Sequence, residues 1–319
     1  MTLLIDESFD FDDIETRLKD SDPEIRRVAV MDLAETADPE AAQLAITALQ
    51  DADANVRKQA AMVLDEFESP EVTTALVDTL SDPDDDVAQA AAETLAEIKE
   101  PESGPILLAS LKNPDSAFVK ASILRALRAL RISDAQSPAL EALEDESAQV
   151  RREAVGVLAY LKNDDVLFAL MNAARRDVDP EVRRIAMGSL VFSRSDKATE
   201  TLVQGLGDDN WLVREEAAFV IGKIGLLQAL DPLINAMQDD YWQVRVKAAA
   251  SLGKLKDPRA VPVLGEALSY SISNLRKESA CALGEIADPS AVPLLKTALK
   301  DVDPDVRKMA QWALSQIES

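Results

Sequence analysis

Five aromatic side chains lie between residues 211 and 270, where their spacing fits a recognition surface. Trp211 and Trp242 are 31 residues apart, Tyr241 precedes Trp242, and Phe219 and Tyr270 lie nearby. They include two of the three tryptophans and two of the three tyrosines of the chain. Aromatic side chains on a solvated edge often mark a surface that binds a partner or a flat ligand. The pattern therefore indicates a binding site. The structural alternative is that both tryptophans pack over neighbouring loops.

Four cationic side chains accompany these aromatic residues. Arg214 and Arg245 each follow a tryptophan by three residues, and Lys223 and Lys254 follow the arginines by nine. Guanidinium and ammonium groups bind anions such as a propionate or a partner carboxylate. The structural alternative is an ion pair with a loop aspartate for each arginine and a solvated helix face for each lysine.

Residues for catalysis and metal binding are scarce. The chain has no histidine, which excludes histidine-based acid–base catalysis and most zinc sites. The single cysteine, Cys281, excludes an internal disulfide, and we expect it to be a small hydrophobic residue rather than a nucleophile. The aspartates between residues 82 and 86 lack the spacing and the glycine of a calcium loop. We therefore predict no catalytic residue, no metal site and no cofactor.

The candidate residues belong to sequence repeats. A Val-Arg pair, or a close relative of it, recurs at intervals of 31 residues, or 32 in two cases. A period of about 30 to 45 residues with two helices per unit is typical of an α-solenoid. The pairs are Ile25-Arg26, Val56-Arg57, Val87-Ala88, Val119-Lys120, Val150-Arg151, Val182-Arg183, Val213-Arg214, Val244-Arg245, Leu275-Arg276 and Val306-Arg307.

Each repeat is predicted to hold two short helices, as the segment 239–268 illustrates. Apolar residues between 244 and 255 recur every three or four positions, so they share one helix face. Asp257-Pro258 ends this helix because proline cannot continue it. A second apolar stripe follows over 260–268. Neither helix can bury its apolar face alone, so we expect copies of the unit to stack on both sides.

The pattern predicts an all-α fold, a right-handed α-solenoid of about ten two-helix repeats. We expect residues 1–10 to form an N-terminal tail or partial cap and residues 11–319 to form a single solenoid domain. The second helix of each repeat is expected to line the concave face and the first helix the convex face.

Acidic loops and small residues predict how the repeats stack. Asp, Ser or Asn before each second helix can cap it. The repeated arginine can reach the loop aspartate of its own or the neighbouring repeat, which would produce an Asp–Arg ladder that Ala88 and Lys120 interrupt. Gly222, Gly253 and Gly284 hold one equivalent position. Since glycine costs about 1 kcal/mol relative to alanine in a helix, its recurrence indicates close helix approach or a surface kept clear.

The net charge of −24 is unevenly distributed. Residues 1–110 contain 28 acidic and 7 basic residues, whereas residues 111–319 contain 30 and 27. We therefore distinguish a strongly acidic part, 11–110, from a near-neutral part, 111–319, which carries the aromatic residues. Contacts with nucleic acid need clustered Lys and Arg, so we expect no nucleic-acid partner but a protein partner, one with a basic surface. We expect no membrane insertion and no signal peptide, and hence a cytoplasmic protein.

The consensus D-P-x-x-V-R-x-x-A-A-x-x-L-G-x-I-x-D-P-x-A-V-P-x-L-x-x-A-L resembles the HEAT-like repeat of the phycobilisome-lyase family. The segments 239–268 and 265–299 match it best, and the resemblance covers almost the whole chain. It implies an α-solenoid fold. The family includes bilin lyase subunits, chaperone-like assembly factors and interaction proteins, and some members are thought to assist iron–sulfur scaffolds.

These observations favour a non-catalytic interaction scaffold or assembly factor that binds a protein partner on its concave face. The resemblance leaves two alternatives open. One is a phycocyanobilin (bilin) lyase or chromophore-handling subunit, which would make the protein an enzyme or part of one. The other is a partner of iron–sulfur or metallocofactor assembly.

Overall fold

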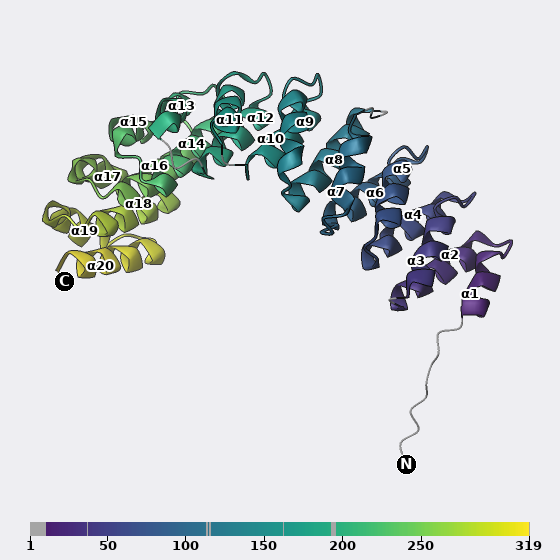
Figure 1. Ribbon diagram of the computed structural model, residues 1–319. Helices are drawn as coiled ribbons and strands as arrows, with labels where there is room; N and C mark the ends of the chain where they lie inside the picture. Colours follow the sequence, from purple (N-terminus) through teal and green to yellow (C-terminus); the bar gives the residue numbers. More distant parts are fainter. Residues whose placement is uncertain are drawn as a thin grey trace, which may run out of the picture. The chain divides into compact units, whose positions relative to one another are not determined.

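The chain folds into helices throughout the part that the structure describes. This computed structural model contains twenty α-helices and no strand within the described residues, as the repeat pattern predicts (Figure 1). The predicted tail or cap at 1–10 lies outside them. The described residues are 11–36, 38–112, 114, 116–161, 163–192 and 196–318.

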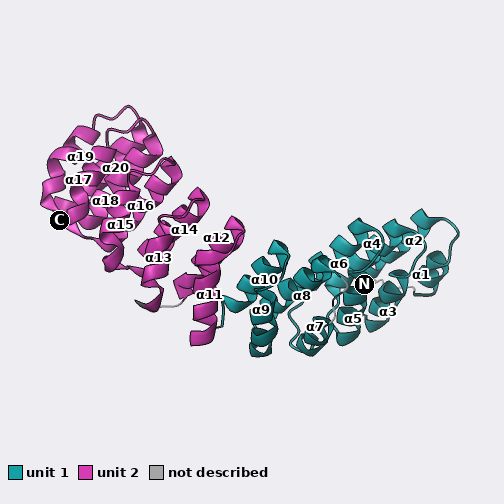
Figure 2. Cartoon of the chain, turned by 90° about the horizontal axis from the view of Figure 1, so that it is seen from above, with its two compact units in different colours: residues 1–161 teal, residues 162–319 magenta. Residues whose placement is uncertain are grey.

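The chain divides into two compact units, unit 1 at residues 1–161 and unit 2 at residues 162–319 (Figure 2). Each unit contains five of the ten helical pairs. A single continuous solenoid domain remains a prediction of the sequence.

Unit 1 is built from two layers of helices. Each second helix packs against the second helix of the next repeat, from α2 through α10, and the first helices lie along their other side. The first helices are α1 (Phe11–Leu18), α3 (Pro39–Ala48), α5 (Pro70–Thr79), α7 (Ser103–Ser110) and α9 (Gln136–Ala142). The second helices are α2 (Pro23–Asp32), α4 (Ala54–Val63), α6 (Asp85–Glu97), α8 (Ala117–Leu130) and α10 (Ala148–Leu158).

Unit 2 repeats this arrangement, with α12, α14, α16, α18 and α20 packed in succession. Its first helices are α11 (Asp164–Arg176), α13 (Thr199–Gly205), α15 (Leu230–Ala236), α17 (Val261–Ala267) and α19 (Val292–Ala298). Its second helices are α12 (Pro180–Ser189), α14 (Trp211–Ile224), α16 (Trp242–Leu255), α18 (Ser273–Ile286) and α20 (Pro304–Glu318). Short 3₁₀ turns join many pairs, at η1 (Leu33–Glu35), η2 (Leu64–Glu66), η3 (Ser133–Ala135), η4 (Leu190–Phe192), η5 (Asp196–Ala198), η6 (Leu227–Ala229), η7 (Pro258–Ala260) and η8 (Pro289–Ala291).

Small and branched apolar side chains fill the space between the layers. Val56, Val213 and Val244, each the valine of a Val-Arg pair, are almost completely buried, and so are most alanines of the second helices. Burying such a side chain contributes about 1.5–3 kcal/mol. These valines therefore fix the inner face of their helices, which leaves the neighbouring arginines at the edge of the layer, whereas Ile25, at the equivalent position of α2, is 39% exposed.

The predicted ladder forms between successive repeats. Arg57 on α4 donates two hydrogen bonds to the carboxylate of Asp82, at 2.7 and 2.8 Å, and two more to carbonyl oxygens of its own loop. The partner aspartate follows this arginine by 25 residues. The same connection is made by Arg26–Asp51, Arg183–Asp208, Arg214–Asp239 and Arg276–Asp301.

Lys120 does not interrupt this ladder, contrary to the prediction from the sequence. Lys120 donates to Asp145 at 2.7 Å, at the usual 25-residue offset. Its ammonium group makes one hydrogen bond to the carboxylate where an arginine makes two, because it is a point charge rather than a planar fork. The fourth repeat is thus connected to the fifth, through a simpler contact.

Recurring glycines let neighbouring second helices approach closely, as predicted. A methyl group on Gly222 would lie 2.7 Å from the Cα atom of Ser251 on the next second helix. The equivalent distances are 2.8 Å from Gly253 to Ala282 and 2.7 Å from Gly284 to Ala313. Carbon atoms do not pack at such distances, so the spacing of α14, α16, α18 and α20 requires glycine at these positions.

Candidate functional site

All nine candidate residues lie in unit 2, on α14 and α16 or in the loops before α16 and α18. They fall into two groups. The first group, here called the rim, surrounds the starts of the helices and consists of Trp211, Arg214, Tyr241, Trp242, Arg245 and Tyr270. The second group, here called the ridge, runs along the exposed sides of the second helices and includes Phe219, Lys223 and Lys254.

Aromatic rings of the rim stack across the boundary between repeats. The rings of Trp211 and Tyr241 are 5.4 Å apart and inclined by only 7°. Trp211 is the first residue of α14, whereas Tyr241 ends the loop before α16. Tyr241 and Trp242 remain 46% and 36% exposed. The two tryptophans thus differ, since Trp211 has an aromatic partner on the next repeat and Trp242 offers its ring to solvent.

Arg214 holds this stack in place. Its guanidinium carbon lies 5.6 Å from the centre of the Tyr241 ring. The same guanidinium donates to Asp239 at 2.6 and 2.9 Å and to the carbonyl oxygens of residues 208 and 209. Its hydrogen bonds are therefore directed into the ladder, which limits what it can offer to a bound anion.

Arg245 occupies the equivalent position on α16 but has a different neighbour. The residue 25 positions later is Tyr270 rather than an aspartate, and the Arg245 guanidinium carbon lies 4.7 Å from the centre of that ring. Its Nε atom is buried without a hydrogen-bond acceptor in the described part of the chain. The sequence identified both residues, but not that Tyr270 removes the acceptor of Arg245. The 25-residue offset between each ladder arginine and its aspartate is the signal that reveals the missing acceptor.

The ridge combines an exposed ring with alternating charges. Phe219 is 44% exposed, and the ammonium group of Lys247 lies 5.5 Å from the centre of its ring. Burial raises the pKa of Glu216, on α14, and also of Glu278, on α18. The positive charge of Lys247 opposes the shift in both carboxyl groups. This lysine, which the sequence did not single out, links the ridge across three helices.

The two predicted lysines of the ridge differ in their surroundings. Lys254 forms an ion pair with Glu285 of the next second helix. Lys223 is exposed at the last turn of α14. Of these two lysines, Lys223 is the one whose ammonium group has no ion pair with another described residue.

Cys281 lies on the ridge, partly buried on α18. Burial, together with the negative charges of Glu278 and Glu285, raises the pKa of its thiol to about 11. The thiol is therefore protonated at neutral pH, and only the thiolate is an effective nucleophile.

We expect iodoacetamide at pH 8 to alkylate Cys281 at least about tenfold more slowly in the folded protein than in urea. An unfolded cysteine has a pKa near 8.5, so a larger fraction of it is thiolate at this pH. The rate in the folded protein should continue to rise above pH 9.5. Equal rates in the folded and unfolded protein would contradict this prediction.

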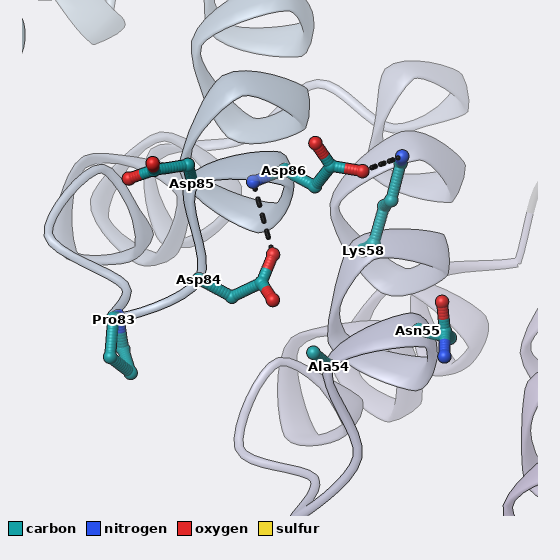
Figure 3. Close-up of a pocket in the computed structure, with 7 residues that line it drawn as sticks. All are labelled: Ala54, Asn55, Lys58, Pro83, Asp84, Asp85 and Asp86. Carbon is teal, nitrogen blue, oxygen red and sulfur yellow. Dashed lines mark hydrogen bonds and ion pairs between the residues drawn. The ribbon is translucent and has the colours of Figure 1, made fainter.

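An acidic depression of about 400 Å³ lies in unit 1, between α4 and the start of α6 (Figure 3). Asp84 accepts hydrogen bonds from the backbone N–H groups of Asp86 and Val87, and so caps α6. Asp86 pairs with Lys58 at 2.8 Å. Asp85 is exposed and turned away from this pair (Figure 3). The carboxylates mainly hold the helices in place, while Asp85 adds to the negative surface.

The described residues contain no cluster of three or more His, Cys, Asp or Glu side chains placed to hold a metal ion. None of the helices described for this chain combines the length and the apolar character needed to cross a membrane.

Comparison with known proteins places this geometry in a wider group. The sequence profile of HEAT repeats matches residues 12–93, 44–128, 137–222, 199–280 and 271–319. No curated protein sequence gives a match.

Several solved structures share the fold. An engineered protein is 22% identical, with a TM-score of 0.52 over 96% of this chain and 98% of its own. Kap95p, whose structure was solved with RanGDP, is 17% identical with a TM-score of 0.65, over 96% of this chain and 50% of its own. Kap121p bound to Nup53p is 15% identical with a TM-score of 0.57, over 95% and 40%. The chain thus spans about half the length of Kap95p and a smaller share of Kap121p. Sequence identities as low as these establish the fold alone.

Proposed function

Because the chain belongs to the HEAT-repeat family, we propose that it is a non-catalytic interaction scaffold or assembly factor. The protein partner would contact the rim and the ridge of unit 2. The observation that carries this proposal is the pair of exposed rings, Tyr241 and Trp242, with the mostly buried Arg214–Asp239 ion pair next to Tyr241. Solvent-exposed aromatic side chains on a rigid base are typical centres of binding energy in protein interfaces. The solved complexes of Kap95p and Kap121p support the proposal by showing that related solenoids hold protein partners.

A pull-down from the native host, followed by binding measurements with the captured protein, tests this proposal. We expect Trp242→Ala to weaken binding by about 2 kcal/mol, or about 30-fold, mainly through faster dissociation, because it removes a large contact area. Phe168→Ala is the matched control, since Phe168 is 66% exposed but lies on α11, a first helix. An unchanged dissociation rate for Trp242→Ala, or an equal loss in the control, would contradict the proposal.

The acidic part of unit 1 is proposed to attract a partner with a basic surface. Exposed charges act over about 8–10 Å at physiological salt, so they change association rates more than dissociation rates. The structure shows how to test this without damaging the fold. Asp84 caps α6 and is unsuitable for substitution, whereas Asp78 and Asp85 are exposed carboxylates.

We expect the double variant Asp78→Lys with Asp85→Lys to associate several-fold more slowly with the captured partner at low salt and to show a weaker salt dependence. Glu266→Lys with Asp305→Lys, an exposed pair in unit 2, changes the net charge equally and serves as control. If both double variants match the wild type across a salt series, the acidity serves solubility rather than steering.

The bilin alternative has one supporting feature, the cation of Arg245 beside exposed rings, which would suit a propionate. Mixing the protein with phycocyanobilin separates the two functions. A shift in visible absorbance that disappears in Trp211→Ala or Trp242→Ala would favour chromophore handling. No shift would leave the scaffold as the function to pursue.

A further inference from the structure

The ladder follows a rule that makes exceptions informative. In five repeats an arginine Nε atom donates to an aspartate 25 residues later, at 2.6 to 2.8 Å. A second guanidinium nitrogen donates to the other oxygen of the same carboxylate. Each aspartate also accepts a backbone N–H from its own loop, as Asp239 does from Tyr241. The carboxylate thus accepts hydrogen bonds both from the arginine of the preceding repeat and from the backbone of its own loop.

Arg245 breaks the rule on the receiving side. This repeat has the arginine, but Tyr270 stands where the aspartate would be. The Arg245 Nε atom is buried without an acceptor among the described residues. Burying a donor without an acceptor destabilises the folded protein. The tyrosine ring interacts with one face of the guanidinium group and cannot replace the lost hydrogen bonds along its edge.

The loop that contains Tyr270 also lacks the negative charge of its counterparts. Its sequence, Ser-Tyr-Ser-Ile-Ser over 269–273, has no acidic residue. The helix that follows, α18, begins at Ser273, and Ile272 before it supplies no side-chain cap, whereas α4, α6 and α12 are capped by an aspartate. This junction therefore lacks the acceptors that Arg245 would need, within a chain that is otherwise rich in them.

We propose that Arg245 binds an aspartate or glutamate side chain supplied by the protein partner, which takes the role of the missing ladder carboxylate. This inference rests on the proposed function. Trp242 lies one helical turn before Arg245, so its exposed ring flanks the same place. The partner segment would therefore combine a carboxylate with an apolar group that covers Trp242. In the free protein Tyr270 occupies the position from which a carboxylate of the chain itself would bind Arg245.

A small molecule with both features, 3-phenylpropionate, tests the site in the full chain. Its binding is followed through the Arg245 Nε–H signal in ¹H–¹⁵N NMR spectra, with 3-phenylpropionamide as the uncharged control. We expect a saturable shift of that signal for the carboxylate and none for the amide. Tyr270→Phe, which keeps the ring, should bind as the wild type does.

Two variants close the site by different means. Tyr270→Asp restores the ladder, so it should raise the melting temperature while weakening 3-phenylpropionate binding at least about tenfold. Arg245→Gln removes the cation without leaving a carboxylate unpaired, so it should fold normally and also lose binding. The proposal is wrong if the carboxylate gives no saturable shift, if the amide gives the same shift, or if Tyr270→Asp binds with unchanged affinity.

The captured partner separates this inference from the proposed function. If the partner binds the wild type and Tyr270→Asp equally while Trp242→Ala weakens it, the scaffold function holds and the carboxylate site is wrong. If neither Trp242→Ala nor Tyr270→Asp changes partner binding, both are wrong. Loss of partner binding in both variants supports both.

Discussion

Replacing Gly222 by alanine is expected to destabilise unit 2 by about 3 kcal/mol, although alanine is the better helix former by about 1 kcal/mol. The added methyl group would lie 2.3 Å from the hydroxyl oxygen of Ser251 and 2.7 Å from its Cα atom. That hydroxyl donates a buried hydrogen bond to the carbonyl oxygen of Ala218, at 2.6 Å. The substitution therefore forces α14 and α16 apart and disrupts the hydrogen bond that joins them.

Urea unfolding followed by tryptophan fluorescence measures this effect, because all three tryptophans lie in unit 2. Gly188→Ala is the matched control on α12. Its methyl group would meet only the flexible end of the Glu216 side chain, so we expect stability within about 1 kcal/mol of the wild type. A Gly222→Ala variant as stable as Gly188→Ala would show that the second helices can separate at little cost.

Replacing Arg57 by alanine should destabilise unit 1 by about 3 kcal/mol, because it leaves the carboxylate of Asp82 buried without its cation. The two side chains are only 14% and 8% exposed. Arg27→Ala is the control, since Arg27 pairs with the exposed Glu24 and should contribute less than about 0.5 kcal/mol. Hydrogen exchange at α4 and α6 reports the loss locally.

The effect of Arg57→Ala should depend on pH in a defined direction. Hydrogen bonds from Arg57 lower the pKa of Asp82 below its usual value. A carboxyl group whose pKa is lower in the folded state contributes stability above its unfolded pKa, near 4, and loses that contribution as the pH falls through its folded value. The difference between wild type and Arg57→Ala should therefore be largest near pH 6 and shrink below pH 4. A difference that stays constant down to pH 2 would contradict the ion-pair explanation.

The spacing of particular residues made most of this fold predictable. A valine or another aliphatic residue every 31 or 32 residues indicated where each second helix lies, because a side chain that is buried in most repeats must return to the same face. Gly222, Gly253 and Gly284 indicated close helix contact through the same regular spacing. Glycine weakens a helix, so its recurrence at one position indicates that a larger side chain would not fit there.

The site was less predictable because its contacts cross repeats and depend on side-chain orientation. The sequence placed Trp211 and Trp242 at equivalent positions, but nothing in it showed that Trp211 would stack on Tyr241 and leave Trp242 exposed. Lys247 was overlooked for the same reason, because its partners Phe219, Glu216 and Glu278 come from two other helices. Arg214 and Arg245 looked alike until the offset to the next aspartate was known.

The glycine contacts between α14, α16, α18 and α20 also bear on the conformational entropy of binding. Helices that touch through backbone atoms have little freedom to shift, so the aromatic side chains at their ends project from a base that is already ordered in the free protein. Flexible surfaces lose that freedom when a partner binds, and the loss lowers their affinity. In unit 2 the ordering takes place during folding, and a small number of exposed rings can therefore suffice to hold a partner.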